Sequence, residues 1–172
     1  MFSPEKTSSS EGNRPIDIAQ KLLSLIESGS PYRSDKDLLH PEVVFRDVMH
    51  FETSMGNGFA TLLNYSDGME TFTRALLALP EVSAPKQCGL LFLARDIAIK
   101  HGIVFPESIP ANWEEGGEVG YDLTQEIDKE TSALDTAYWS TFGDAEHDIY
   151  RACLSYMQDN ESILRRRNTK NT

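Results

Sequence analysis

Apolar residues recur at helical spacing in several separate segments, and this periodicity limits the chain to a helical fold. Side chains three and four residues apart share one face of a helix and can be buried together. Alternating apolar residues, which are typical of strands, are confined to 103–105, a stretch too short to found a sheet. The sequence therefore predicts an all-α fold, a compact single-domain helical bundle. The helical series fall within 16–26, 35–55, 69–79, 84–100 and 144–158.

Glycine and proline residues separate these segments. The turn Gly56-Asn57-Gly58 ends the helix predicted over 35–55, and the short apolar segment from Phe59 to Leu63 is predicted to be helical as well. Residues 105–121 contain two prolines and three glycines, which predicts an acidic loop. Another helix is expected over 123–134.

The expected core follows from the distribution of apolar side chains. Residues 84–100 are apolar on nearly all sides, a pattern typical of a helix surrounded by others, so we expect the central helix there. Tyr138, Trp139 and Phe142 are expected to join the core, because large aromatic side chains contribute much of the area that folding buries.

The length and the ends of the chain indicate one domain with polar termini. A chain of 172 residues buries enough surface to fold without disulfide bonds or structural metal ions. Cys88 and Cys153 are therefore expected to be free thiols. Residues 1–13 are predicted to be a disordered tail, 14–164 the helical domain and 165–172 a basic tail. No apolar run approaches the roughly 20 residues that span a bilayer, and the first residues lack a signal-peptide pattern. These features favour a cytoplasmic protein.

The surplus negative charge is concentrated in one segment. Between Glu107 and Asp148 there are twelve acids and one base, which carry the whole net charge of −11. Such a block attracts basic surfaces and repels nucleic acids and anionic membranes. The alternative is a solvated surface in which some acids favourably meet the dipole at the start of a helix. The predicted partner-binding acids are Glu114, Glu115, Glu118, Asp122, Glu126, Asp128, Glu130, Asp135, Asp144, Glu146 and Asp148.

Part of this block has the spacing of a helix face. Asp122, Glu126 and Glu130 are four residues apart, which places neighbouring side chains about 6 Å from one another on one side of a helix. Like charges at this spacing destabilise a helix slightly. A binding role would explain why the chain tolerates them.

The glycine turn offers a second candidate site. Glu52 lies on an apolar stripe just before it, and we expect its carboxylate to accept backbone N–H groups from Asn57 to Phe59. The alternative is a catalytic carboxylate near His50. His147-Asp148 lacks the further ligands of a metal phosphohydrolase, so neither a metal nor another cofactor is predicted.

Two segments resemble a known family. Phe51 to Gly68, FETSMGNGFATLLNYSDG, resembles the signature of the DNA-mimic-protein-like family of bacterial domains, and Leu134 to Asn160 looks like its closing segment. The resemblance covers roughly 40–160. Thr61 stands where the family has glutamine, and Asn57 interrupts its glycine pair. The resemblance implies an all-α bundle, and the family's name-giving member is an acidic dimer that occupies a helix-turn-helix regulator.

Together these features predict a non-catalytic acidic domain that binds a basic protein. In its sharpest form the hypothesis is a DNA mimic that occupies the DNA-binding surface of a regulator, with no direct contact to nucleic acid or membrane. A homodimer is left open. One alternative is an immunity-type or adaptor protein that neutralises a different basic protein. The other is an enzyme centred on Glu52, His50 and the glycine turn.

Overall fold

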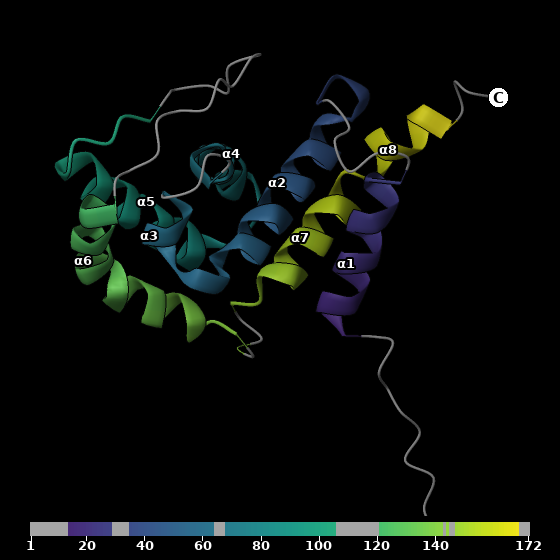
Figure 1. The fold of residues 1–172 in the computed structure, drawn as a ribbon. Coiled ribbons are helices and arrows are strands. Elements are labelled where there is room, and N and C mark those ends of the chain that lie inside the picture. The colour runs from purple at the N-terminus through teal and green to yellow at the C-terminus, as the bar shows by residue number, and fades with distance from the viewer. Residues whose placement is uncertain are drawn as a thin grey trace, which may run out of the picture.

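The predicted all-α fold is confirmed (Figure 1). The computed structural model describes residues 14–28, 35–63, 68–105, 121–142, 144 and 147–168, and at 121–124 and 165–168 it describes the backbone alone. All regular secondary structure within these ranges is helical. The α-helices are α1 (Pro15–Ile26), α2 (His40–Ser54), α3 (Phe59–Leu62), α4 (Gly68–Ala78), α5 (Pro85–Lys100), α6 (Tyr121–Trp139), α7 (Ile149–Asp159) and α8 (Glu161–Asn168). Short 3-10 helices form η1 (Asp35–Asp37), η2 (Met55–Asn57) and η3 (Leu79–Glu81).

Helix α2 lies at the centre of the fold. It packs against α1, α4 and α7, and Val48 and Phe51 are among its fully buried side chains. The expectation that α5 is the central helix is wrong: Leu93 and Ile99 of α5 are about half exposed. Helix α5 packs mainly against α6 and η3, so its other sides meet solvent despite their apolar character.

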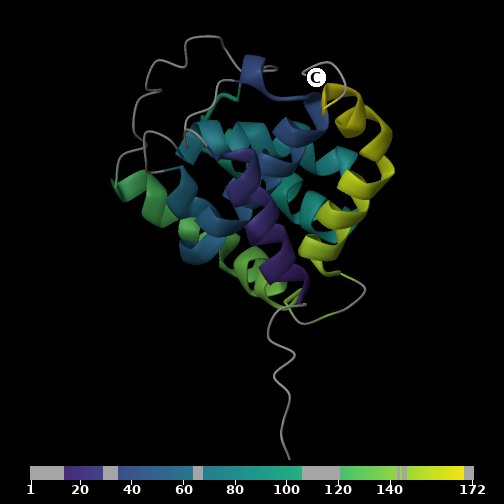
Figure 2. The same cartoon turned by 90° about the vertical axis from the view of Figure 1, so that its right-hand side faces the viewer.

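The helices form two neighbouring groups. Helices α1, α2 and α7 run side by side (Figures 1 and 2). Helix α6 packs against α3 and α5, on the opposite side of the molecule from α1 and α8 (Figure 1). Helix α6 is therefore backed by the core along one side only. Within the described ranges, no helix combines the length and apolar character that a bilayer span requires.

Several helix boundaries follow from local chemistry. The first turns of α1, α2 and α5 contain Pro15, Pro41 and Pro85. Proline fits there because the first N–H groups of a helix have no acceptor within the helix, so the missing N–H costs no hydrogen bond. Helix α7 starts five residues later than expected, because Asp148 is its N-cap and accepts hydrogen bonds from the N–H groups of Tyr150 and Arg151.

Two predicted boundaries fall inside longer helices. Helix α6 runs from Tyr121 to Trp139 and so exceeds the segment expected over 123–134. Helix α8 continues to Asn168, so the basic tail predicted from residue 165 begins within a helix. The tail predicted over 1–13 and most of the loop predicted over 105–121 lie outside the described residues.

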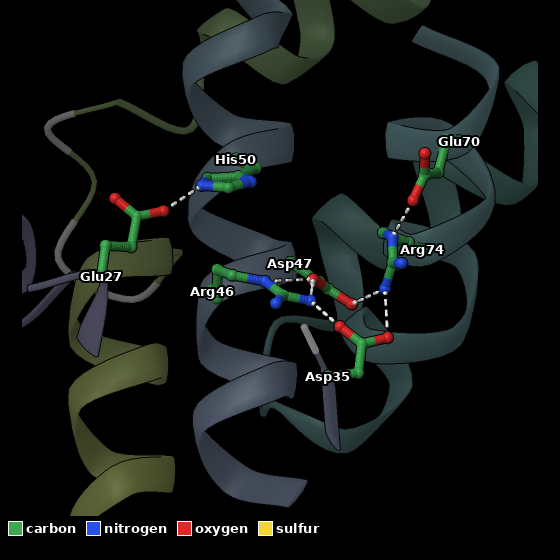
Figure 3. A network of polar contacts seen from close by, with 7 residues as sticks. All are labelled: Glu27, Asp35, Arg46, Asp47, His50, Glu70 and Arg74. Atoms are coloured by element: carbon green, nitrogen blue, oxygen red, sulfur yellow. Dashed lines mark hydrogen bonds and ion pairs between the residues drawn. The ribbon is translucent and has the colours of Figure 1, made fainter. Parts of the chain in front are cut away.

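A buried ion network joins η1, α2 and α4 (Figure 3). The Arg46 guanidinium donates to Asp35 at 2.6 Å and to Asp47 at 2.7 Å. Arg74 on α4 donates to the same two carboxylates, at 2.9 Å and 3.4 Å, and to Glu70 at 2.7 Å. Because Arg46 and Asp47 are both buried, each charge depends on its partners for the stabilisation that water would otherwise supply.

We expect Asp47→Asn to lower the free energy of unfolding by about 3 kcal/mol, since it leaves two arginines with insufficient negative charge nearby. Denaturant titration at neutral pH measures this loss. The matched control is Asp96→Asn, which removes an exposed partner of Arg95 and should cost less than about 1 kcal/mol. Equal losses in the two variants would show that the network contributes no more than a surface pair.

Candidate functional site

The glycine turn is held by a carboxylate from another part of the chain. Phe59 starts α3, and its backbone N–H donates to Oδ1 of Asp135 on α6 at 2.9 Å. Gly58 precedes it with φ of +86°, a conformation that favours glycine. A Cβ atom at Gly58 would lie 2.9 Å from the Asp135 carboxylate. The turn therefore combines a glycine backbone conformation with a close approach of α6.

This arrangement corrects one expectation and bears on another. The acceptor for the turn is Asp135, whereas Glu52 was expected to take that role. Asp135 was expected to face a partner, yet one of its oxygens is bonded inside the fold. Burial raises the pKa of Asp135, against the effect of the Phe59 hydrogen bond.

Glu52 has a different environment, inside the core. Its side chain accepts a hydrogen bond from the Tyr138 hydroxyl on α6 and faces the Tyr150 hydroxyl on α7 at 3.3 Å. Only 5% of Glu52 is exposed. The Tyr138 ring packs edge-on against Phe51 and Phe59, with ring centres 5.9 and 5.7 Å away, so aromatic packing fixes the hydroxyl that Glu52 needs.

Burial dominates the protonation chemistry of this cluster. It raises the pKa of Glu52 even though two hydroxyl groups favour the charged form. Burial, together with the nearby Glu52 charge, also raises the pKa of the Cys153 thiol to about 12, so this thiol stays protonated at neutral pH. A protonated thiol is a poor nucleophile. Cys88 and Cys153 are both free, as expected, although Cys88 is only partly buried.

The alternative of a catalytic site that joins Glu52 and His50 has no contact between the two side chains among the described interactions. His50 contacts Glu27 at the end of α1, with 2.6 Å between Nε2 and Oε1 (Figure 3). Residues two apart on a helix point to different sides, which explains the separation. Among the described residues, no group of three or more His, Cys, Asp or Glu side chains is arranged to hold a metal ion.

The acidic segment is only partly described. The side chain of Asp122, and the whole of Glu114, Glu115, Glu118 and Glu146, lie outside the described part of the chain. Their predicted role stays a prediction.

Glu126 and Glu130 share one side of α6, as their spacing predicted. Both face the end of α5: Glu130 meets Lys100 at 2.7 Å and His101 at 2.8 Å, and Glu126 lies 3.7 Å from His101. Lys100 is the main reason that the pKa of Glu130 falls below its usual range. Glu130 is therefore partly neutralised within the chain, while the Glu126 side chain remains 64% exposed.

The remaining acids have unequal surroundings. Asp128 is exposed on α6, and within the described ranges its carboxylate has no hydrogen bond or ion pair. Asp144 lies 2.9 Å from His147. Asp148 caps α7 and also accepts from Arg151 at 3.2 Å. Local helix chemistry therefore explains Asp148, whereas Glu126 and Asp128 present their charge to solvent.

An exposed aromatic pair lies where α6 ends. Trp139 and Phe142, which were expected in the core, are 43% and 42% exposed, and only Tyr138 of the predicted trio is fully buried. Their rings stack, with centroids 4.9 Å apart. The sequence contains no direct signal for this exposure: Trp139 is the last residue of α6, and Phe142 lies in the turn that follows it.

A cavity of about 300 Å³ opens beside the pair, between the starts of α1 and α7. Its walls are formed mainly by apolar side chains, and two charged residues contribute to them. The lining residues are Arg14, Pro15, Ile16, Thr141, Phe142, Asp148, Ile149 and Tyr150.

Gly58→Ala should lower the free energy of unfolding by about 2 kcal/mol, because alanine resists the backbone conformation and its methyl group meets Asp135. Thermal or denaturant unfolding provides the measurement. Gly56→Ala is the matched control: a methyl group there meets no described atom within 4 Å, so the change should stay within about 0.5 kcal/mol. Similar losses at both positions would contradict this account of the turn.

Tyr138→Phe removes the closest donor to Glu52 and should cost about 2 kcal/mol at pH 8. The raised pKa means that folded Glu52 binds a proton at higher pH than the unfolded chain does. Proton uptake by Glu52 therefore stabilises the folded state as pH falls. The gain builds up between the raised pKa of the folded state and the pKa of about 4.3 in the unfolded chain. The cost of Tyr138→Phe should accordingly be smaller at pH 5 than at pH 8, because a carboxyl group that takes up a proton depends less on the donor.

Denaturant titrations at the two pH values test this dependence. Tyr156→Phe is the control, since its hydroxyl meets the exposed Glu81 at 3.2 Å and should contribute less than about 1 kcal/mol at either pH. In a Glu52→Gln background, the pH dependence of the Tyr138→Phe effect should disappear. A loss that is the same at pH 5 and pH 8 would contradict a titrating Glu52.

The comparisons with known proteins leave the family open. No family model, no curated protein and no solved structure matches the chain. The resemblance of Phe51 to Gly68 to the DNA-mimic-protein-like family therefore remains an expectation from the sequence. Any function proposed for the chain rests on its own residues and geometry.

Proposed function

We propose that this chain is an acidic protein-binding domain whose α6 presents carboxylates to a basic surface of a partner protein. The observation that carries the proposal is the exposure of Glu126 and Asp128, which point to different flanks of α6, a helix packed against α3 and α5. Their charges are part of the net charge of −11 that the chain carries. A field of one sign at a fixed surface accelerates encounters with oppositely charged proteins.

The packing of α6 supports a defined binding surface. Ile127, Thr131 and Tyr138 are buried along its inner side, which sets the rotation of the helix about its axis. The outer carboxylates are consequently held on an ordered backbone, and less conformational freedom is lost when a partner binds them.

We further propose that the partner is a DNA-binding protein and that the acidic surface occupies its DNA site. The resemblance of two segments to the DNA-mimic-protein-like family supports this finer proposal, as does the segregation of acids into one part of the sequence. A basic partner that does not bind DNA would instead indicate an immunity-type or adaptor protein.

The test uses the double variant Glu126→Gln and Asp128→Asn. Both substitutions nearly preserve side-chain volume and reduce the net charge from −11 to −9. Glu130 is left unchanged because it pairs with Lys100 and His101, and its loss would perturb the free protein. We expect association with a basic partner, purified after nuclease-treated capture from cell lysate, to slow by about threefold to tenfold at low salt. Stability should be unaffected.

Asp159→Asn with Glu161→Gln is the matched control, since it removes the same formal charge from α7 and α8 on the other side of the molecule (Figure 1). The control should slow association much less. Affinity should fall with salt, because the Debye length shrinks from about 10 Å at 0.1 M to about 3 Å at 1 M. Salt-insensitive binding would reject the acidic surface, whereas salt-sensitive binding that excess duplex DNA cannot displace would reject only the DNA mimic.

A further inference from the structure

The exposed aromatic pair Trp139 and Phe142 forms an apolar surface at the end of α6. Phe142 also forms part of the wall of the 300 Å³ cavity, together with Pro15, Ile16 and Ile149. Exposed stacked rings beside a cavity are typical of the anchor regions of protein interfaces, where a few aromatic side chains contribute much of the binding energy.

Acidic groups flank this apolar surface. At about 100° and 1.5 Å per residue, Asp135 lies about one turn before Trp139 on nearly the same face of α6, whereas Asp128 lies on that face about 16 Å away along the axis. Asp128 is exposed, and Asp135 is partly exposed with Oδ1 accepting from Phe59. On the cavity side, Asp148 caps α7 and meets Arg151.

One positive group also lines the cavity. The Arg14 guanidinium donates to both carboxylate oxygens of Asp17, at 2.9 and 3.0 Å, so its charge is partly neutralised within the chain. Because Arg14 and Asp148 each have an ion-pair partner, the described group that favours a cation beside the rings is mainly Asp135. A purely apolar partner would desolvate the partly exposed Asp135 without compensation.

We propose that the Trp139–Phe142 surface binds an arginine side chain of the basic partner, with the guanidinium stacked on the rings on the side of Asp135. The inference rests on the proposed function, and it specifies that the partner contributes arginine rather than lysine at this surface. A guanidinium is planar, weakly hydrated and able to stack on aromatic rings, while a lysine ammonium is compact and strongly hydrated. The chain already contains this kind of contact, since Arg95 lies 4.7 Å from the centre of the Phe92 ring.

The experiment compares two probes of equal charge, an octapeptide of arginine and an octapeptide of lysine, by calorimetric titration at low salt. The full-length wild-type chain should bind the arginine peptide roughly threefold to fivefold more tightly than the lysine peptide. Trp139→Leu keeps apolar bulk but removes the ring. It should abolish the preference while changing the affinity for the lysine peptide by less than about twofold.

Two variants separate this inference from the acidic surface itself. Glu126→Gln with Asp128→Asn should weaken both peptides and retain the preference for arginine. Phe92→Leu removes another partly exposed ring and should leave both affinities unchanged. Equal binding of the two peptides by the wild type, or a preference that survives Trp139→Leu, would overturn the arginine site without affecting the acidic surface. Failure of both peptides to bind would overturn the proposed function as well.

A spectroscopic measurement covers the case in which Trp139→Leu fails to fold. The chain has two tryptophans, so Trp113→Phe leaves Trp139 as the single indole. The arginine peptide should change the emission of this indole, and the lysine peptide should change it much less at equal saturation. Identical emission changes, or none, with saturating arginine peptide would also overturn the proposal.

Discussion

Charged side chains buried on α2 determine where the neighbouring helices can lie. Arg46 and Asp47 require Asp35 from the preceding segment and Arg74 from α4. Further along the same helix, Glu52 requires hydroxyl groups from α6 and α7. Because a buried charge that loses its partner costs several kcal/mol, these contacts favour one arrangement over the alternatives that an apolar helix would permit. The α2 charges thus specify the packing as well as contributing to it.

The sequence predicted the helices better than their places in the fold. Apolar spacing and proline position located α1, α3 and α5 closely, since these signals act within a few residues. Hydropathy misplaced the central helix, because it treats Arg46 and Asp47 as surface residues and cannot register that they pair. It also placed the start of α7 at Asp144, where the acids resemble a first helical turn, whereas Asp148 alone is the cap.

In the candidate sites, too, the sequence predicted features set by neighbouring residues and missed contacts between residues far apart in the chain. The common face of Glu126 and Glu130 was predictable from a spacing of four, but the position of Lys100 opposite them was not. The roles of Glu52 and Asp135 depend on residues 76 to 98 positions away in the chain. No pattern within one helix contains that information. Acidity alone therefore could not separate carboxylates that hold the fold together from those that remain available to a partner.

The distant contacts of Glu52 have a consequence for synthesis of the chain. The ribosome delivers α2 and α4 first, so Arg46, Asp47 and Arg74 can meet as soon as α4 has emerged. Glu52 must wait for tyrosines 86 and 98 residues later. Until then its carboxylate keeps water at that side of α2, which opposes premature collapse there. The contacts of the buried acid therefore cannot be completed before the last helices are made, and we expect this side of α2 to remain hydrated until then.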